Sequence, residues 1–268
     1  MQNQTETVSN ALKGNKQALE TLIKSVQGQI YNLSVRFYWN PIDAEDATQE
    51  ILIKIITHLS SFKNGSAFET WCYRIATNYL LNSKRKQTEE LTFEIGEFHL
   101  NEGLKHQDYN SADKNILEEE VKIGCSTSML TCLSRPLRLA YILGEIFEFD
   151  GNEGATILEI EPATFRKRLS EARIHIRKFM GNNCGIYDTK NNCRCSKQIN
   201  YDLTINRVNP KHLVFADKGQ VKKTVTEIEN IGQDIMIFQS HPNYNTPETI
   251  LTNIKNLIDS GKYSVLSN

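Results

Sequence analysis

The chain has few of the residues that interrupt regular structure: 6 prolines and 14 glycines among 268 residues. This scarcity excludes collagen-like and Gly/Pro-rich low-complexity classes. No apolar run approaches the roughly 18 residues of a membrane span. The segment Met1–Asn10 is polar and lacks the apolar core of a secretory signal. The sequence therefore predicts a cytoplasmic protein without membrane contact, and at about 150 residues per domain its length predicts about two domains.

The chain also carries little net charge, −1 at pH 7, because 31 Lys and Arg stand against 32 Asp and Glu. A global basic excess, the usual sign of nucleic-acid binding, is missing. The charge is instead sorted by region. From Gln87 to Val121 ten acidic residues stand against two lysines, and apolar residues are sparse. The first part of this stretch, 87–112, is therefore predicted to be an acidic linker.

The first 86 residues have the apolar periodicity of a helical bundle. After a stripe through Leu22 and Ile30, Asn40-Pro41 breaks the first long helix. We expect another helix from Asp43 to Leu59, with acidic residues in its first turns, where the helix dipole favours them. A further helix is expected from Phe68 to Lys86. Short connections between these helices predict a compact bundle.

A helix-turn-helix pattern lies between Leu137 and Phe179. We expect a short helix at Glu153–Leu158, a tight turn, and a long helix at Ala163–Phe179. Ala155 is the small residue that would let the two helices cross closely. Between Pro162 and Lys178 six basic residues stand against one acid, which is the charge pattern of a helix that contacts phosphates. The alternative is a solvated amphipathic helix.

The helix expected at Phe68–Lys86 carries aromatic, amide and basic side chains. Trp71, Arg74 and Asn78 are suited to stacking on unpaired bases and to contacts with base edges. The alternative is that Trp71 and Tyr79 are core residues.

Three motifs together resemble the extracytoplasmic-function (ECF) class of bacterial RNA polymerase sigma factors. They are the stretch DAEDATQE at Asp43–Glu50, the stretch FETWCYRIATN at Phe68–Asn78, and the stretch TFRKRLSEAR at Thr164–Arg173. The resemblance implies an all-α fold with two helical domains: sigma region 2 at 1–86 and the region 4 helix-turn-helix at 113–180. The acidic linker 87–112 separates them, and a small C-terminal extension follows at 181–268.

The resemblance also implies roles for individual residues. Docking on core RNA polymerase falls to Asp43, Glu45, Asp46, Gln49, Glu50 and Ile51. Contacts with the minus-ten promoter element fall to Lys63, Asn64, Ser66, Phe68, Trp71, Arg74, Asn78, Lys84 and Arg85. Contacts with the minus-thirty-five element fall to Thr164, Arg166, Lys167, Arg168, Ser170, Glu171 and Arg173.

The predicted function is to bind core polymerase, recognise promoter DNA and promote its melting for transcription initiation, with an anti-sigma factor as a further expected partner. The rival interpretation is a free-standing helix-turn-helix regulator, which would have no need of the Asp43–Glu50 motif. An enzyme is not predicted, because the sequence has no Walker loop, nucleophile elbow or zinc-protease motif.

The C-terminal extension contains three closely spaced cysteines, Cys184, Cys193 and Cys195. No cofactor is required by the predicted function, but a zinc site is one interpretation, with His175 or His212 as a fourth ligand. A redox switch and a purely structural role are the alternatives. Near the end of the chain, 247–260 is expected to form an amphipathic helix that docks within the molecule.

Overall fold

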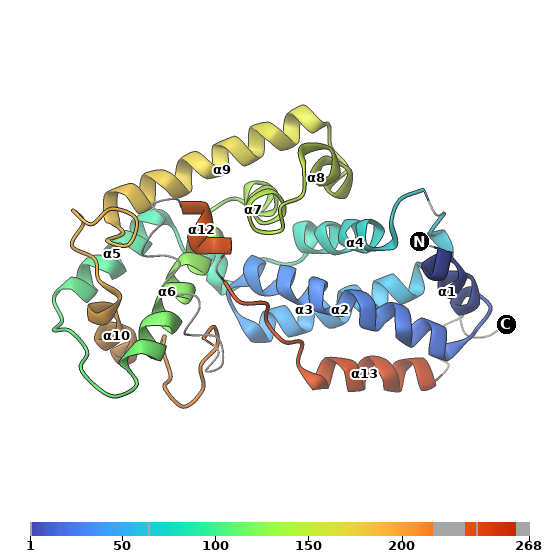
Figure 1. Ribbon diagram of the computed structural model, residues 1–268, viewed down its shortest axis with the longest axis horizontal. Coiled ribbons are helices and arrows are strands. Elements are labelled where there is room, and N and C mark those ends of the chain that lie inside the picture. The colour runs from blue at the N-terminus through green and yellow to red at the C-terminus, as the bar shows by residue number, and fades with distance from the viewer. Residues whose placement is uncertain (1, 64, 217–233, 240, 261–268) are drawn as a thin grey trace. The chain divides into compact units, whose positions relative to one another are not determined.

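The computed structural model describes residues 2–63, 65–216, 234–239 and 241–260, and every regular element in these ranges is helical (Figure 1). The predicted all-α class is confirmed. The chain divides into two compact units that do not follow the order of the sequence. The first unit is formed by Met1–Arg85, Asp150–Phe165 and Tyr244–Asn268, and the second by Lys86–Phe149 and Arg166–Asn243.

The first unit contains the expected bundle. Its helices are α1 (Gln2–Leu12), α2 (Lys16–Tyr38), α3 (Pro41–Thr57), the 3₁₀ turn η1 (Leu59–Ser61), α4 (Phe68–Asn82), α8 (Gly151–Leu158) and α13 (Glu248–Asp259). The Asn40 side chain accepts a hydrogen bond from the backbone N–H of Ile42, and Pro41 occupies the first turn of α3, which explains why α3 begins there. The apolar stripes of α2, α3 and α4 meet in the core, and α8 packs on α4.

The second unit is built from the rest of the chain. Its elements are η2 (Gln87–Glu90), α5 (Phe93–Leu104), α6 (Lys114–Thr131), α7 (Arg135–Tyr141), the π-helical turn η3 (Ile142–Ile146), most of α9 (Pro162–Asn183), α10 (Cys195–Thr204) and α12 (Asp234–Gln239). Helix α10 packs on both α5 and α6. The C-terminal extension therefore contributes to the core of this unit.

The acidic stretch 87–112 is not the loosely structured linker that its composition predicted. It contains η2 and α5, and Phe93 of α5 packs against Phe179 with the ring centroids 5.3 Å apart. The Glu89 side chain is only 3% exposed and accepts hydrogen bonds from Arg135 (2.7 and 2.9 Å) and Arg138 (3.1 Å). Burial alone would raise the pKa of Glu89, but these bonds, the Lys86 N–H and the two guanidinium charges bring it to about 2.

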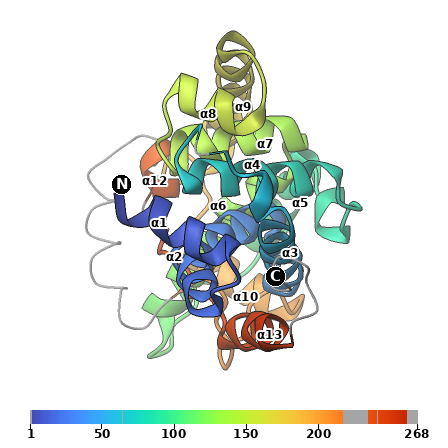
Figure 2. The ribbon, with the colours of Figure 1, turned by 90° about the vertical axis from the view of Figure 1, so that its right-hand side faces the viewer.

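The C-terminal helix α13 lies against α2 and α3 (Figures 1 and 2). The isoleucines of its apolar face are buried: Ile250, Ile254 and Ile258 are each at most 2% exposed. The chain entering α13 is fixed by Asn32, whose side chain exchanges two hydrogen bonds with the Tyr244 backbone (2.8 and 2.9 Å). The structure thus shows the expected amphipathic helix, and it docks within the molecule.

Candidate nucleic-acid interface

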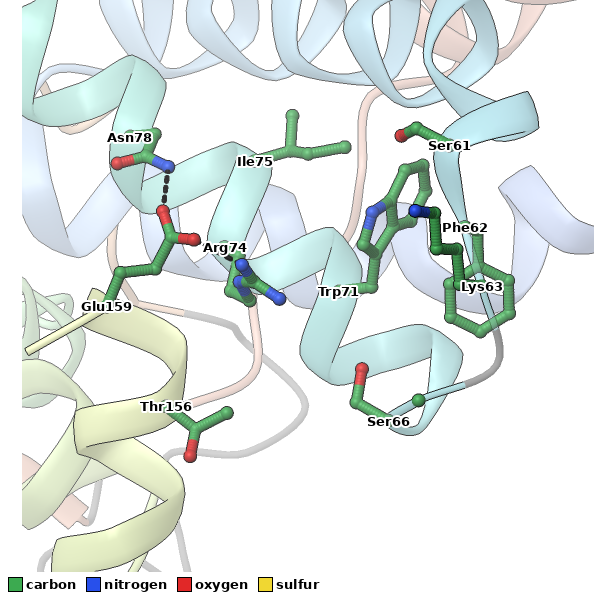
Figure 3. A pocket seen from close by; sticks show the side chains of 11 residues that line it. Ser61, Phe62, Lys63, Ser66, Trp71, Arg74, Ile75, Asn78, Thr156 and Glu159 are labelled. Carbon is green, nitrogen blue, oxygen red and sulfur yellow. Dashed lines mark hydrogen bonds and ion pairs between the residues drawn. The ribbon is translucent and has the colours of Figure 1, made fainter.

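A cavity of about 440 Å³ opens between α4, the loop that precedes it and α8 (Figure 3). Its lining includes five residues that the sequence assigned to minus-ten recognition, namely Lys63, Ser66, Trp71, Arg74 and Asn78. Asn64, assigned to the same task, lies outside the described residues. The bundle therefore brings side chains from a loop and from two turns of α4 to one hollow, where cationic, amide and aromatic groups face the same space.

The aromatic part of this site is largely a packing cluster. Phe62, Phe68 and Trp71 have ring centroids 5.4 to 5.7 Å apart. Phe68 is 1% exposed, so its prediction as a base contact is wrong for this structure: it lies on the apolar side of α4 and supports the neighbouring rings. Trp71 is 9% exposed but still lines the cavity. Trp71 is therefore mostly a core residue, but part of it still faces the cavity, where a base could contact it.

The polar side chains of the cavity are bound by a residue that the sequence analysis did not assign to the site. Glu159, at the end of α8, forms an ion pair with Arg74 and accepts a hydrogen bond of 2.8 Å from the Asn78 amide (Figure 3). Hydrogen bonds from Arg74 and Asn78 lower the pKa of the Glu159 carboxyl. Beside it, the buried Thr77 hydroxyl donates to the Ile157 carbonyl at 3.3 Å. Nothing in the local sequence around Glu159 signalled this long-range contact.

Helix α4 ends earlier than predicted. Its last residue is Asn82, and the backbone of Ser83 is already extended. Lys84 and Arg85, assigned to minus-ten contacts, therefore follow the helix on exposed chain. They remain cationic surface residues in the same unit as the cavity.

The acidic helix α3 presents most of its predicted docking residues at the surface. Asp46 and Glu50 are exposed, while Asp43, Glu45 and Gln49 are half-buried. Ile51 is wrong as a surface contact, because it is 0% exposed and belongs to the stripe with Ile55 that faces the bundle core. Gln49 already has a partner within the chain: its Oε1 accepts a hydrogen bond of 3.1 Å from Asn253 of α13.

The helix-turn-helix has the predicted elements. Asp150 caps α8 through the N–H groups of Asn152 and Glu153, and Glu153 returns a bond to the Asp150 N–H. Glu159 ends α8 in the left-handed region (φ 53°), and α9 begins at Pro162. The close crossing depends on Gly154, since an added Cβ would lie 2.3 Å from the Phe165 ring. Ala155, predicted for this role, is buried beside it.

Helix α9 exposes most of the residues assigned to minus-thirty-five recognition. Arg166, Lys167, Ser170 and Glu171 are exposed, and Thr164 and Arg168 are half-buried. Arg173 differs from the others, because it pairs with the Glu145 carboxylate, whose side chain is 2% exposed, through a 2.8 Å bond from Nε. Arg173 thus compensates a buried charge in its own unit, and the exposed basic residues of α9 form two pairs, Arg166 and Lys167 near its start and Arg177 and Lys178 further along.

The three cysteines of the C-terminal extension line one small cavity together with a fourth, Cys125 of α6. Burial raises the pKa of the Cys125 and Cys195 thiols well above the usual value and that of Cys193 to about 11, and the neighbouring thiols add to each shift. Neither histidine considered as a fourth ligand lines the cavity: His175 is stacked on Phe93 and His212 is exposed. Within the described ranges, no three His, Cys, Asp or Glu side chains are placed to hold a metal ion.

Comparisons with known proteins agree with this architecture. Residues 22–90 match the family model for Sigma-70 region 2. The chain is 31% identical to the RNA polymerase sigma-H factor of Pseudomonas aeruginosa over 65% of its own length and 91% of that protein. It is 28% identical to the ECF RNA polymerase sigma factor SigW of Bacillus subtilis (64% and 93%) and 29% identical to the ECF RNA polymerase sigma-E factor of Escherichia coli (62% and 88%).

Two solved structures are also similar to the chain. One is CnrH in complex with the cytosolic domain of CnrY, with a TM-score of 0.46 at 16% identity, covering 65% of this chain and 95% of the other. The second is the sigma factor RpoE in complex with the anti-sigma factor NepR from Bartonella quintana, with a TM-score of 0.40 at 20% identity, covering 59% and 94%.

The fold and the site define an all-helical DNA-binding protein with a helix-turn-helix. The chain belongs to the sigma-70 family of RNA polymerase sigma factors, in its ECF class. A free-standing helix-turn-helix regulator is not favoured, because the match to Sigma-70 region 2 includes most of α2 and all of α3 and α4. Among the described residues, no helix has both the length and the apolar character needed to cross a membrane.

Proposed function

We propose that this sigma factor works through three separate surfaces. The acidic surface of α3 binds core RNA polymerase, the cavity beside α4 captures the melted minus-ten element, and the exposed first half of α9 contacts the minus-thirty-five element. The polymerase would carry out all bond-making chemistry, so the chain itself needs no catalytic group. It would act in the cytoplasm, where promoter DNA and polymerase are found, and an anti-sigma factor is a further expected partner.

One observation carries the minus-ten assignment: five of the residues that the sequence assigned to this element line a single cavity of about 440 Å³. Extracting a base from a duplex costs a few kcal/mol of stacking and pairing energy. A protein offsets this cost by binding the base in a pocket and stacking side chains on it. Trp71 offers an aromatic surface, and Arg74, Asn78 and Lys63 offer hydrogen-bond donors around it. An unpaired base and its phosphate require this combination of groups.

The minus-thirty-five assignment is supported by the exposure of Arg166, Lys167 and Ser170 on consecutive turns near the start of α9. The second helix of a helix-turn-helix enters the major groove with its N-terminal residues against base edges. Arg168 is half-buried, so it is better suited to a contact at the rim of the groove than to deep insertion.

Run-off transcription with purified core polymerase tests the proposal as a whole. The chain should direct initiation at a subset of genomic promoters and co-elute with core polymerase. Lys167→Ala should weaken binding to minus-thirty-five duplex DNA by about 1–3 kcal/mol if Lys167 recognises a base, and should leave polymerase affinity unchanged. Lys190→Ala, which removes an exposed cation outside α9, is the matched control. Binding to duplex DNA without any association with polymerase would instead identify a free-standing regulator.

A further inference from the structure

The acidic face of α3 begins with an apolar side chain that the sequence analysis did not assign to it. Ile42, in the first turn of the helix, is 72% exposed, more than any other large apolar side chain of the described residues. Ile51, the apolar residue that the motif assigned to polymerase docking, is 0% exposed. Single exposed apolar side chains are common on protein surfaces, so the position of Ile42 on the helix decides whether it has a role.

Ile42 lies on the outward stripe of α3 together with residues predicted to dock on polymerase. A helix brings residues at i, i+4, i+7 and i+11 to one face, so Ile42, Asp46, Gln49 and Ile53 share a stripe. Asp46 is exposed, and Gln49 and Ile53 are half-buried. Ile42 is therefore the exposed apolar head of the surface to which the polymerase contacts were assigned.

Helix α13 meets this stripe at Gln49 and leaves Ile42 exposed. The Asn253 side chain of α13 donates a hydrogen bond of 3.1 Å to Gln49. Gln49 lies two turns beyond Ile42, a distance of about 10 Å along the helix axis. A partner can therefore reach Ile42 while α13 is still docked on α2 and α3.

The backbone that carries Ile42 is fixed by the cap of α3. The Asn40 side chain accepts a hydrogen bond of 2.9 Å from the Ile42 N–H, and the Asn40 carbonyl accepts one of 2.9 Å from the Ala44 N–H. The β-branched side chain of isoleucine has one strongly preferred χ1 rotamer in a helix. Ile42 thus loses little conformational entropy when a partner covers it, which favours binding.

The residues around Ile42 are acidic. Asp43, Glu45 and Asp46 lie within about one turn of it, and Asp46 is exposed while the other two are half-buried. An apolar contact surrounded by polar groups is the usual anatomy of a protein interface, and a few such contacts supply most of the binding energy. Charge complementarity requires a partner with basic residues around an apolar recess.

We propose that Ile42 is the apolar anchor of the polymerase-docking surface and inserts into an apolar recess with a basic rim on core RNA polymerase. The inference rests on the docking role proposed above for α3. The carboxylates attract a basic partner over a distance, and salt screens this attraction. Burial of Ile42 removes apolar surface from water, a contribution that does not depend on attraction between charges.

The test measures the affinity of the full chain for surface-captured core polymerase at low and at high salt. Ile42→Ala should weaken binding about 10-fold or more, by the same factor at both salt concentrations. Asp46→Asn should weaken binding at low salt and have a smaller effect at high salt. Ile42→Leu keeps the volume and apolar character of the side chain, so its affinity should stay within about three-fold of the wild type.

Ile205→Ala is the matched control, because it makes the same substitution at an exposed isoleucine (40%) of the second unit and should leave the affinity unchanged. Alanine is a stronger helix former than isoleucine, and Ile42 is exposed, so Ile42→Ala should unfold at the wild-type temperature or above.

The outcomes separate the anchor from the docking role of α3. Unchanged binding by Ile42→Ala together with weaker binding by Asp46→Asn would overturn the anchor and leave the docking role intact. Unchanged binding by both variants, or no binding by the wild type, would overturn both. A wild-type dimer that Ile42→Ala dissolves without a change in polymerase affinity would assign Ile42 to a contact between two copies of the chain, and the anchor would again be wrong.

Discussion

One buried charge in the second unit, that of Glu89, is paired with residues that lie far away in the sequence. Glu89 is bound by Arg135 and Arg138, 46 and 49 positions further along the chain. Arg138, 2% exposed, also donates to the carbonyls of Leu130, Thr131 and Leu133. Removing one member of a buried ion pair typically costs about 3–5 kcal/mol, because the other charge stays buried without compensation.

We therefore expect Glu89→Gln to lower the free energy of unfolding by about 3–5 kcal/mol in urea denaturation at neutral pH. The matched control is Glu90→Gln, the exposed neighbour in the same 3₁₀ turn, which should change stability by less than about 0.5 kcal/mol. Equal effects of the two substitutions would show that the Glu89 contacts contribute nothing.

The same residue predicts a pH dependence. The pKa of Glu89 falls from 4.5 to about 2 on folding, so its contribution is fully present above pH 4.5 and is lost as the pH falls through 2. The stability difference between wild type and Glu89→Gln should shrink over this window. Asp202 also has a shifted pKa, which burial raises to about 6 against the opposing effect of Arg207. Both proteins contain Asp202, so its contribution to the pH dependence of stability cancels in the comparison. A difference independent of pH would contradict the assignment.

Glu159 predicts a second effect of a single residue. Its carboxylate occupies the donors of Arg74 and Asn78, which are proposed to contact the minus-ten element. An exposed ion pair contributes up to about 1 kcal/mol, so Glu159→Gln should bind a single-stranded minus-ten oligonucleotide about two- to five-fold more tightly in fluorescence anisotropy. Glu161→Gln, an exposed neighbour with the same substitution, should leave affinity unchanged. Weaker binding by Glu159→Gln would mean that Glu159 itself contacts the nucleic acid.

At the scale of the element, the sequence predicted the helices of the motifs and their buried faces, but not their partners from distant parts of the chain. The break at Asn40-Pro41 and the apolar stripes of α3 and α9 are local signals, and they gave the right boundaries within a few residues. Helix α5 was missed because its apolar residues are few and contact α9 and α10, which no local pattern reveals. Ile51 and Phe68 were assigned as contacts from the motifs although each also lies on the apolar stripe of its helix, and the structure buries both in the core.

The helix-turn-helix crossing gives a prediction about an element. Gly154→Ala would place a Cβ 2.3 Å from the Phe165 ring. The methyl group gains up to about 1 kcal/mol of helix propensity, but overpacking costs about 1–3 kcal/mol, so we expect a net loss of thermal stability and of minus-thirty-five binding. Gly181→Ala is the control: its Cβ would lie 3.6 Å from Tyr187, an ordinary contact, and should be neutral or stabilising. A stabilised Gly154→Ala would show that the crossing adapts freely.

At the scale of the whole molecule, the order of the sequence does not predict the order of packing. The predicted boundaries at 86, 112 and 180 assume that neighbouring residues share a domain. In the structure, α8 and the C-terminal helix α13 belong with the first bundle, while the Cys184–Cys195 loop belongs with the second unit. The motifs identified the candidate surfaces, but the partners of those surfaces, Glu159 and Asn253, come from segments that the motifs did not include.

Helix α13 gives a prediction at this scale. Ile254→Asp, a change within its buried face, should loosen α13 from α2 and α3 and raise affinity for core polymerase. If the docking of α13 on α2 and α3 contributes about 1–2 kcal/mol, its release raises the affinity for core polymerase about 5- to 30-fold. Thr252→Asp introduces the same side chain and charge at an exposed position of the same helix and is the control. Surface-captured polymerase measures both affinities, and unchanged binding by Ile254→Asp would show that α13 leaves the docking surface accessible.

The hydrogen bond from Asn253 to Gln49 thus has a kinetic consequence. A segment tethered to its own target competes at a fixed effective concentration, of millimolar order for short connections, however dilute the protein is. Gln49 is among the α3 residues proposed to bind polymerase, so a polymerase that contacts its amide would have to displace Asn253 first, and the opening rate of α13 would then limit the rate of productive association. Helix α13 would then slow the assembly of the holoenzyme without altering which promoters the holoenzyme selects.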